Sequence, residues 1–155
     1  SDNFFATDSF ALAQPFTFAL LFQQISWTST ERIYGDTADT QPRLFQSATT
    51  PNLAFTTGTS ITTSPTLAVG TYGVIFGCGN GVASYIKTNG GASVVGDAGT
   101  STIAGGIQLG CGGSTLHSSI AAVEFMLFPS ALTDPQLITA QAWMAQQAVL
   151  AGISI

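Results

Sequence analysis

Charge is what this sequence lacks most. Asp, Glu, Lys and Arg together make up 7% of its 155 residues, against about 25% in an average soluble protein. None of the four occurs between Leu44 and Ile86. A surface with so little charge is poorly protected against association, so we expect much of it to face a neighbouring protein in an assembly. The alternative is a secreted domain whose abundant Ser and Thr side chains are simply hydrated.

Positive charge is the scarcest of all. The only cations are Arg32, Arg43 and Lys87, and the net charge is -5. Nucleic acids and anionic membrane surfaces both require clustered Lys and Arg, so neither is an expected partner. The uncharged segment 135–155 is long enough to span a bilayer, but its four glutamines disfavour insertion.

A targeting segment is also missing at the beginning of the chain. The residues Ser1-Asp2-Asn3-Phe4 lack the basic stretch and apolar run of a secretory signal. If Ser1 follows a removed initiator Met, the chain is made in a host cytoplasm without secretion. If Ser1 marks a fragment boundary, an extracellular location remains open.

Cysteine and histidine are too few for a structural zinc site, since the chain has two cysteines and His117 is its single histidine. Cys78 and Cys111 each stand between glycines. We expect free, buried thiols if the chain stays in a cytoplasm, while one disulfide between two sandwich turns remains the alternative.

The acidic residues do not form the pair that glycoside hydrolysis needs. That reaction uses two carboxylates about 5 Å apart, or somewhat further for inversion. No two acidic residues of this chain stand two positions apart on a predicted strand. Glu124 is isolated in an apolar strand, where we expect a structural role, and His117 lies in a Gly/Ser loop without a nucleophile motif. We therefore predict no catalytic residue and no enzyme.

Calcium is the one metal worth considering, because loop carboxylates and backbone carbonyls can hold it. The candidate ligands are Asp36 and Asp39 in one loop and Asp97 in a glycine-rich turn. Acidic residues in such turns usually serve the turn itself, and no loop is densely acidic. We predict no metal or other cofactor, with Ca²⁺ as the lesser alternative.

Hydrophobic residues, by contrast, make up 45% of the chain and are arranged in short alternating runs. In segment 16–22 every second residue is Phe or Leu, which predicts a strand with one strongly apolar face. Further strands are predicted at 32–34, 43–45, 52–56, 71–76, 82–86, 94–95, 107–109 and 120–128. Asn89-Gly90 predicts a type I′ hairpin, and Gly77, Gly79, Asn80 and Gly81 predict a turn. Many short, closely spaced strands indicate a sandwich or barrel.

The C-terminal part of the chain is helical in pattern, over residues 133–150. Thr133 with Gln136 three positions later forms a capping box, and Pro135 fits the first turn. An apolar stripe follows, formed by Ile138, Ala142, Ala145 and Val149 and flanked by Leu137, Met144 and Ala148. Trp143 lies almost opposite this stripe, so it is expected to point outward. It then either anchors a partner or is covered by the chain's own loops or N-terminal arm.

Six short motifs, in their order along the chain, resemble the concanavalin A-like lectin/laminin-G-like jelly-roll family. They are QPFTF (14–18), RIYG (32–35), YIKTNG (85–90), IQLG (107–110), SIAAVEF (119–125) and ALTD (131–134), with the helix running on to Gly152-Ile153. The family often has a Trp in the strand before the Asn-Gly hairpin, and Thr71-Tyr72-Gly73-Val74 lacks it. The resemblance implies an all-β, two-sheet antiparallel jelly-roll sandwich with one C-terminal α-helix. We expect one such domain over 1–155, in which 1–13 is an N-terminal arm or first strand.

The family includes lectins, glycoside hydrolases, adhesion modules and virion surface proteins, so the fold alone does not give the activity. Sugar sites stack a ring on an exposed aromatic side chain. The candidates for glycan or partner contact are Trp27, Tyr34, Tyr72, Tyr85 and Trp143. Trp27, in a polar loop, is the best single choice, although we favour its interpretation as a lid over the sandwich edge.

Two functions remain open. The first is a non-catalytic structural or surface protein of a virus particle, of the kind that decorates a phage capsid or head. It would bind the major capsid protein or another virion protein, or associate with itself. The second is a glycan-binding or adhesion module of a secreted or cell-surface protein. The low charge and the absence of a signal sequence favour the first.

Overall fold

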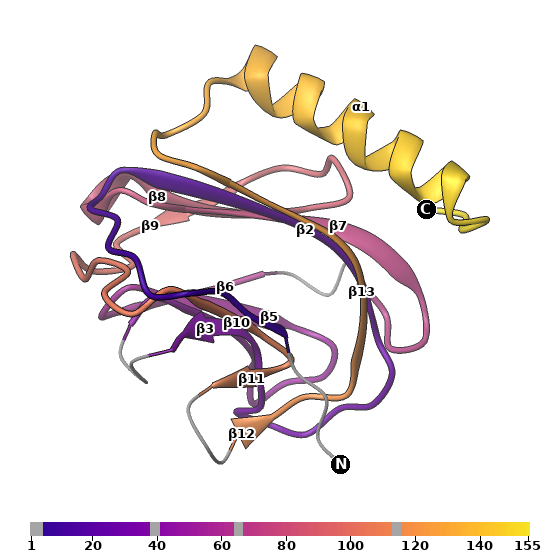
Figure 1. Cartoon of the computed structure of the whole chain (residues 1–155), viewed down its shortest axis with the longest axis horizontal. Coiled ribbons are helices and arrows are strands. Elements are labelled where there is room, and N and C mark those ends of the chain that lie inside the picture. The colour runs from indigo at the N-terminus through magenta and orange to yellow at the C-terminus, as the bar shows by residue number, and fades with distance from the viewer. Residues whose placement is uncertain (1–4, 38–40, 64–66, 113–115) are drawn as a thin grey trace.

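The computed structural model describes residues 5–37, 41–63, 67–112 and 116–155, which form two stacked antiparallel sheets with one helix on the outside (Figure 1). The predicted fold class is therefore confirmed. The first sheet has eight strands, in the order β1-β10-β3-β4-β5-β6, with β12 beside β3 and β11 beside β12. The second has five strands, in the order β13-β2-β7-β8-β9.

The bounds of the strands agree with the hydrophobic alternation at most positions. The first sheet consists of β1 (Phe5–Ala6), β3 (Arg32–Asp36), β4 (Arg43–Gln46), β5 (Leu53–Thr56), β6 (Ser60–Thr62), β10 (Ile107–Leu109), β11 (Cys111–Gly112) and β12 (Leu116–His117). The second consists of β2 (Phe16–Gln24), β7 (Tyr72–Gly79), β8 (Ser84–Thr88), β9 (Val94–Gly96) and β13 (Ile120–Phe128). The short strands β6, β11 and β12 were not predicted. His117, expected in a loop, is paired in β12.

The main core lies between the sheets and is centred on β2. Its alternation places Phe16, Phe18, Leu20 and Phe22 inside the sandwich, all with no exposed surface, and Ala19 and Leu21 on the opposite face. Phe18 is the centre of an aromatic cluster. Its ring centroid lies 4.7 Å from that of Tyr34 and 5.3 Å from that of Phe55.

The glycine-rich segment after residue 76 differs from its prediction. Gly77 and Gly79 do not begin a turn but continue β7, where they pair with Phe18 and Phe16 of β2. A Cβ added at Gly77 would lie 2.2 Å from the Phe18 ring, so the large rings require glycine opposite them. The turn lies instead at the short 3₁₀ helix η1 (Gly81–Ala83). Val82, which was predicted in the strand 82–86, belongs to this turn.

The Asn89-Gly90 turn between β8 and β9 is confirmed. Both residues have positive φ, 47° and 71°, as the central positions of a type I′ turn require. The two cysteines are buried and form no disulfide, as expected.

The C-terminal helix α1 (Asp134–Leu150) follows its predicted cap. The side-chain oxygen of Gln136 accepts a hydrogen bond from the backbone N–H of Thr133 at 2.9 Å. The helix packs on the outer face of the five-stranded sheet, where it forms a second core with Leu21, Val74 and Phe76 (Figure 1). No helix in the described ranges is long and apolar enough to cross a membrane.

The face of α1 that meets the sheet is not the predicted stripe. Its buried residues are Leu137, Ala140, Met144 and Ala148, whereas Ile138 is 68% exposed and Val149 is 75% exposed. The helix carries apolar residues on both faces and no charged residue after Asp134. Periodicity alone therefore could not determine which face packs.

Candidate functional site

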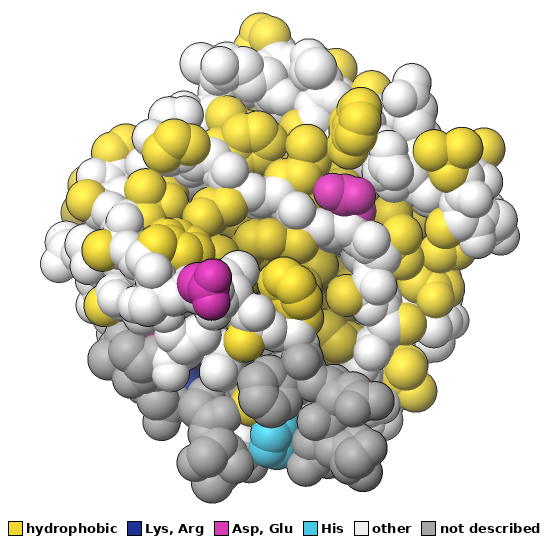
Figure 2. All heavy atoms as spheres, viewed as in Figure 1, with side chains coloured by type: hydrophobic (Ala, Val, Ile, Leu, Met, Phe, Trp, Pro, Cys, Tyr) yellow, Lys and Arg dark blue, Asp and Glu magenta, His cyan; other side chains and the backbone are white. Residues whose placement is uncertain are grey.

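The sandwich is open along one edge, and an apolar cleft lies there. The edge strand of the first sheet is β1, and that of the second is β13. Between them is a cavity of about 570 Å³, lined by side chains of β1, β10, β13 and the segment after β1. This volume is within the usual range of about 300–1,000 Å³ for binding pockets. In Figure 2 the same side of the molecule shows a hollow surrounded by hydrophobic side chains.

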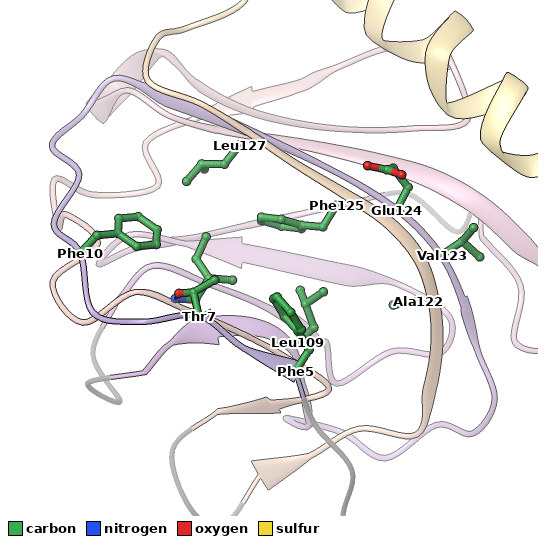
Figure 3. A pocket seen from close by; sticks show the side chains of 10 residues that line it. Phe5, Thr7, Phe10, Leu109, Ala122, Val123, Glu124, Phe125 and Leu127 are labelled. Atoms are coloured by element: carbon green, nitrogen blue, oxygen red, sulfur yellow. The ribbon is translucent and has the colours of Figure 1, made fainter.

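The walls of the cleft are almost entirely apolar. Ten of the described residues line it, namely Phe5, Thr7, Phe10, Ile107, Leu109, Ala122, Val123, Glu124, Phe125 and Leu127. Figure 3 shows Phe10, Phe125 and Leu127 around the hollow, with Phe5 beside Leu109 at its lower end. Phe5 is 58% exposed, so a large apolar ring stands in solvent at the mouth.

The floor of the cleft is fixed by the sandwich core. The Phe125 ring is stacked on Tyr34 at 5.6 Å and on Phe18 at 6.4 Å between centroids. Phe10 and Leu127 are partly buried and pack against the same core. An occupant would therefore meet a surface that is already in place and needs little reorganisation.

The wall formed by the N-terminal segment is tied to β10. The backbone N–H of Thr7 donates to the carbonyl of Ile107 at 2.9 Å, and the N–H of Ile107 donates to the Thr7 hydroxyl oxygen at 3.0 Å. Two β1–β10 residue pairs, Phe5 with Leu109 and Ala6 with Gln108, continue this contact. The hydroxyl of Thr7 thus serves to hold the wall.

Among the described residues that line the cleft, Glu124 is the only charged one. It comes directly after a bulge in β13, since the register against β2 shifts between Ala122 and Glu124. In Figure 3 its carboxylate lies on the α1 side of the β13 ribbon, away from Phe10 and Leu127. A carboxylate at the rim of an otherwise apolar cleft favours an occupant with a cation at that end and disfavours an anion there.

The backbone of β13 adds a second recognition element. Among the described strands β13 pairs only with β2, so its other edge has no strand beside it. Edge strands present unpaired N–H and C=O groups to any extended chain that approaches. Here the edge is nine residues long and apolar except for Glu124.

The aromatic residues singled out from the sequence are not gathered into one site, and none lines the cleft. Tyr34 is fully buried, so its prediction as a surface contact is wrong: it stacks beneath Phe125. Trp27 is partly buried against the sandwich core, which agrees with the lid alternative. Tyr85 packs in the core under α1, and Trp143 is 47% exposed on the helix. Tyr72, at the start of β7, is half-buried.

Burial raises the pKa of two tyrosines and one cysteine. It raises the pKa of Tyr34 far above its usual value, and the nearby Asp36 charge adds to the effect. Burial also raises the pKa of Tyr85 to about 12 and that of the Cys78 thiol above its usual value. All three groups are held in their neutral forms at pH 7, so Cys78 lacks the thiolate character of a reactive cysteine.

The candidate calcium ligands that the structure describes serve turns. The Asp36 carboxylate accepts hydrogen bonds from the N–H groups of Ala104 at 2.7 Å and Gly105 at 2.9 Å. Asp97 accepts one from the N–H of Gly99 at 2.8 Å. Asp39 lies outside the described residues. Within the described ranges, no three His, Cys, Asp or Glu side chains gather as metal ligands would.

The cleft residues were missed from the sequence for a physical reason. Residues 120–128 are apolar at consecutive positions, a pattern typical of a strand buried on both faces. The structure instead places this strand at an edge, with all its residues only partly buried or exposed. The one available signal was the group of phenylalanines in the predicted N-terminal arm, of which Phe5 and Phe10 line the cleft.

Comparison with known proteins gives information about the fold. No protein-family model matches the chain, and no curated protein matches it in sequence. Among solved structures it is similar to the native heptameric SAP-like pentraxin of Limulus polyphemus, with a TM-score of 0.67 and 13% identity over 89% of this chain and 74% of the pentraxin. The fold is a pentraxin-like jelly roll. This agrees with the concanavalin A-like resemblance.

The chain is also similar to part of the Trypanosoma rangeli sialidase solved in complex with sialic acid. The TM-score is 0.61 and the identity is 9%, over 92% of this chain and 27% of the sialidase. At these identities both likenesses establish a shared fold alone.

Proposed function

We propose that this domain is a non-catalytic structural module on the surface of a larger assembly, and that it holds a partner protein in the cleft between β1 and β13. The observation that carries the proposal is the cleft itself: about 570 Å³, apolar, floored by the core and open to solvent. The assembly that the charge-poor sequence favours is a virus particle.

The occupant we propose is an extended segment of the partner. A strand beside β13 would satisfy the backbone groups of its open edge and place every second side chain in the cleft, the mode known as strand addition. Those side chains should be apolar, to match Phe10, Phe125 and Leu127. A Lys or Arg at the end near Glu124 would add a favourable charge contact.

The proposal is tested with a synthetic nine-residue peptide of alternating Val and Ser that carries Lys at both ends. Titration calorimetry is expected to give saturable binding to the wild-type domain. A second peptide, N-methylated at alternate amides, keeps the side chains but cannot donate to β13, so it is expected to bind at least about tenfold more weakly.

The matched protein variants are Ala122→Arg and Ala122→Val. Ala122 is exposed on β13 and lines the cleft, so Arg there fills the mouth with charge while the core is untouched. Ala122→Arg is expected to weaken peptide binding by about tenfold or more, and Ala122→Val to retain it. Equal binding to all three proteins, or no binding at millimolar peptide, would overturn the proposal.

The second candidate function is a glycan-binding or adhesion module, for which the lectin-like fold is the support. Trp27 is partly buried, and the other candidate aromatics are not assembled beside it. A glycan array separates the two functions: binding of a defined sugar that is lost in Trp27→Ala would favour the glycan module over the assembly module.

A further inference from the structure

Several apolar residues of α1 face solvent and have no partner among the described residues. The helix is the outermost layer of the molecule (Figure 1). Ile138 is 68% exposed and Val149 is 75% exposed, and Ala142 lies exposed between them. These side chains point away from the sheet, because Leu137, Ala140, Met144 and Ala148 make the contact with it.

Four apolar residues of α1 follow the spacing of a helix-pairing seam. Ile138, Ala142, Ala145 and Val149 are separated by four, three and four positions; Ala145 is partly buried and the other three are exposed. This is the alternation at which one helix meets another along its length in a coiled coil. Two alanines in the middle allow two helix backbones to approach closely, while the larger residues close the seam at both ends. We call these four residues the α1 seam.

The α1 seam reads the same in both directions: large, small, small, large. A two-fold interface uses the same patch on both subunits, so each patch must complement itself. In an antiparallel pair of these helices, Ile138 lies against Val149 of the second copy. Ala142 then lies against Ala145 of the second copy, and the symmetry axis passes between them. A palindromic seam is what such a pair requires.

Charge also fits a second copy in this orientation. Residues 135–155 contain no charged side chain, and Asp134 at the helix N-terminus is the only charge on α1. The helix is roughly 26 Å long at about 1.5 Å per residue. An antiparallel pair therefore keeps the two Asp134 carboxylates far apart and opposes the helix dipoles favourably. A parallel pair would place both carboxylates side by side.

We propose that this protein self-associates through the α1 seam, as an antiparallel pair of C-terminal helices from two copies of the chain. This contact uses different residues from the β1–β13 cleft, because no residue of the α1 seam lines the cleft. One copy can therefore bind a second copy through α1 and another protein through the cleft.

The contact area makes this a weak dimer in free solution. One helix face on each side buries much less than the roughly 1,200–2,000 Å² of a stable, specific interface. We expect a dissociation constant on the order of 100 µM. Copies held together on an assembly experience effective concentrations in the millimolar range, which is enough to keep the helices paired.

The experiment is sedimentation equilibrium of the full chain from about 10 µM to about 2 mM. The weight-average mass of the wild type is expected to rise from the 15.9 kDa of one chain toward twice that value. The double variant Ile138→Gln with Val149→Gln should stay at the monomer mass, because it makes both ends of the seam polar. Val82→Gln is the matched control: Val82 is 78% exposed but lies outside α1, so self-association should be unchanged.

Charged variants test the orientation. Ala142→Lys alone should weaken association at least about tenfold, because it buries an unpaired cation in the seam. Adding Ala145→Glu to the same chain should restore association, because an antiparallel pair sets each Lys against a Glu of the second copy. A parallel pair would instead set Lys against Lys and Glu against Glu. Circular dichroism verifies that each variant remains folded.

The proposal is overturned if the wild type keeps the monomer mass up to about 2 mM. The seam would then be a contact for a different protein. The proposal is equally overturned if the Ile138→Gln and Val149→Gln pair associates as well as the wild type. Failure of the Lys–Glu variant to recover association would refute the antiparallel arrangement. None of these results depends on the peptide titration that tests the cleft.

Discussion

Gly77 is where a single methyl group should be most disruptive. It lies in the middle of β7, opposite Phe18 of β2. A Cβ at this position would lie 2.2 Å from the Phe18 Cε1 atom and 2.5 Å from its Cζ atom, whereas carbon atoms in contact prefer about 3.5–4.0 Å. Gly77→Ala must therefore displace the ring by more than 1 Å, roughly the difference between those distances.

The Phe18 ring is confined by its neighbours and has no room to shift. Phe18 has no exposed surface, and its ring lies 4.7 Å from that of Tyr34 and 5.3 Å from that of Phe55. Overpacking of this kind costs about 1–3 kcal/mol, and the confined ring favours the upper end. Replacing Gly by Ala also reduces the conformational freedom of the unfolded chain, which offsets about 0.4–1 kcal/mol of this cost. We expect a net loss of about 2 kcal/mol, or roughly 4–8 °C in Tm for a chain of this size.

Urea unfolding followed by tryptophan fluorescence measures this loss. Phe18→Leu provides the rescue: in the double variant, the smaller side chain makes room for the methyl group. Its loss should fall short of the summed single losses by about 1 kcal/mol or more. Gly70→Ala is the control, because its φ of 85° costs about 1–2 kcal/mol while nothing lies within 4 Å of its Cβ. Its effect should simply add to that of Phe18→Leu. A loss below about 0.5 kcal/mol for Gly77→Ala, or additivity with Phe18→Leu, would refute the reasoning.

Two further stability predictions follow from the polar groups. Gln14→Ala should lower the free energy of unfolding in urea by about 2–3 kcal/mol. The Gln14 amide donates to the carbonyl of Ser101 at 2.8 Å and accepts from the N–H of Gly81 at 2.8 Å. A loss below about 0.5 kcal/mol would contradict this prediction. The raised pKa of Tyr34 means that the folded state retains its proton above the unfolded value of about 10. Ionisation is thus disfavoured in the folded state, so Tyr34 leaves stability independent of pH below about pH 10 and lowers it as pH rises above that value. Tyr34→Phe should therefore reduce the fall in unfolding free energy at alkaline pH. At pH 7 the substitution should be neutral or stabilising, since the buried hydroxyl has no hydrogen-bond partner among the described residues. An unchanged fall at alkaline pH, or a clear loss of stability at pH 7, would contradict this prediction.

The fold could be predicted from the sequence more completely than the candidate site. Segment 16–22 predicted a strand with one buried face because its alternation is strict, and that face does form the core. Segment 120–128 also predicted a strand, with the same bounds that the structure gives it. Its position at an edge depends on which strands pair with it across the sheet, and that is a property of the topology. The cleft follows from this position, so it could not be predicted.

The helix illustrates the same limit on a smaller scale. The sequence determined where α1 begins, because a capping box and Pro135 act locally, within one turn. It also predicted a domain of many short β-strands, as in a sandwich or barrel, because period-two patterns and an Asn-Gly turn need no distant partner. Only the tertiary structure decided which face of α1 is buried, since apolar residues occur on both faces and no charge marks the solvent side. It also decided that Gly77 lies within a strand and that Tyr34 lies in the core, because both positions depend on contact with Phe18 from a distant part of the chain.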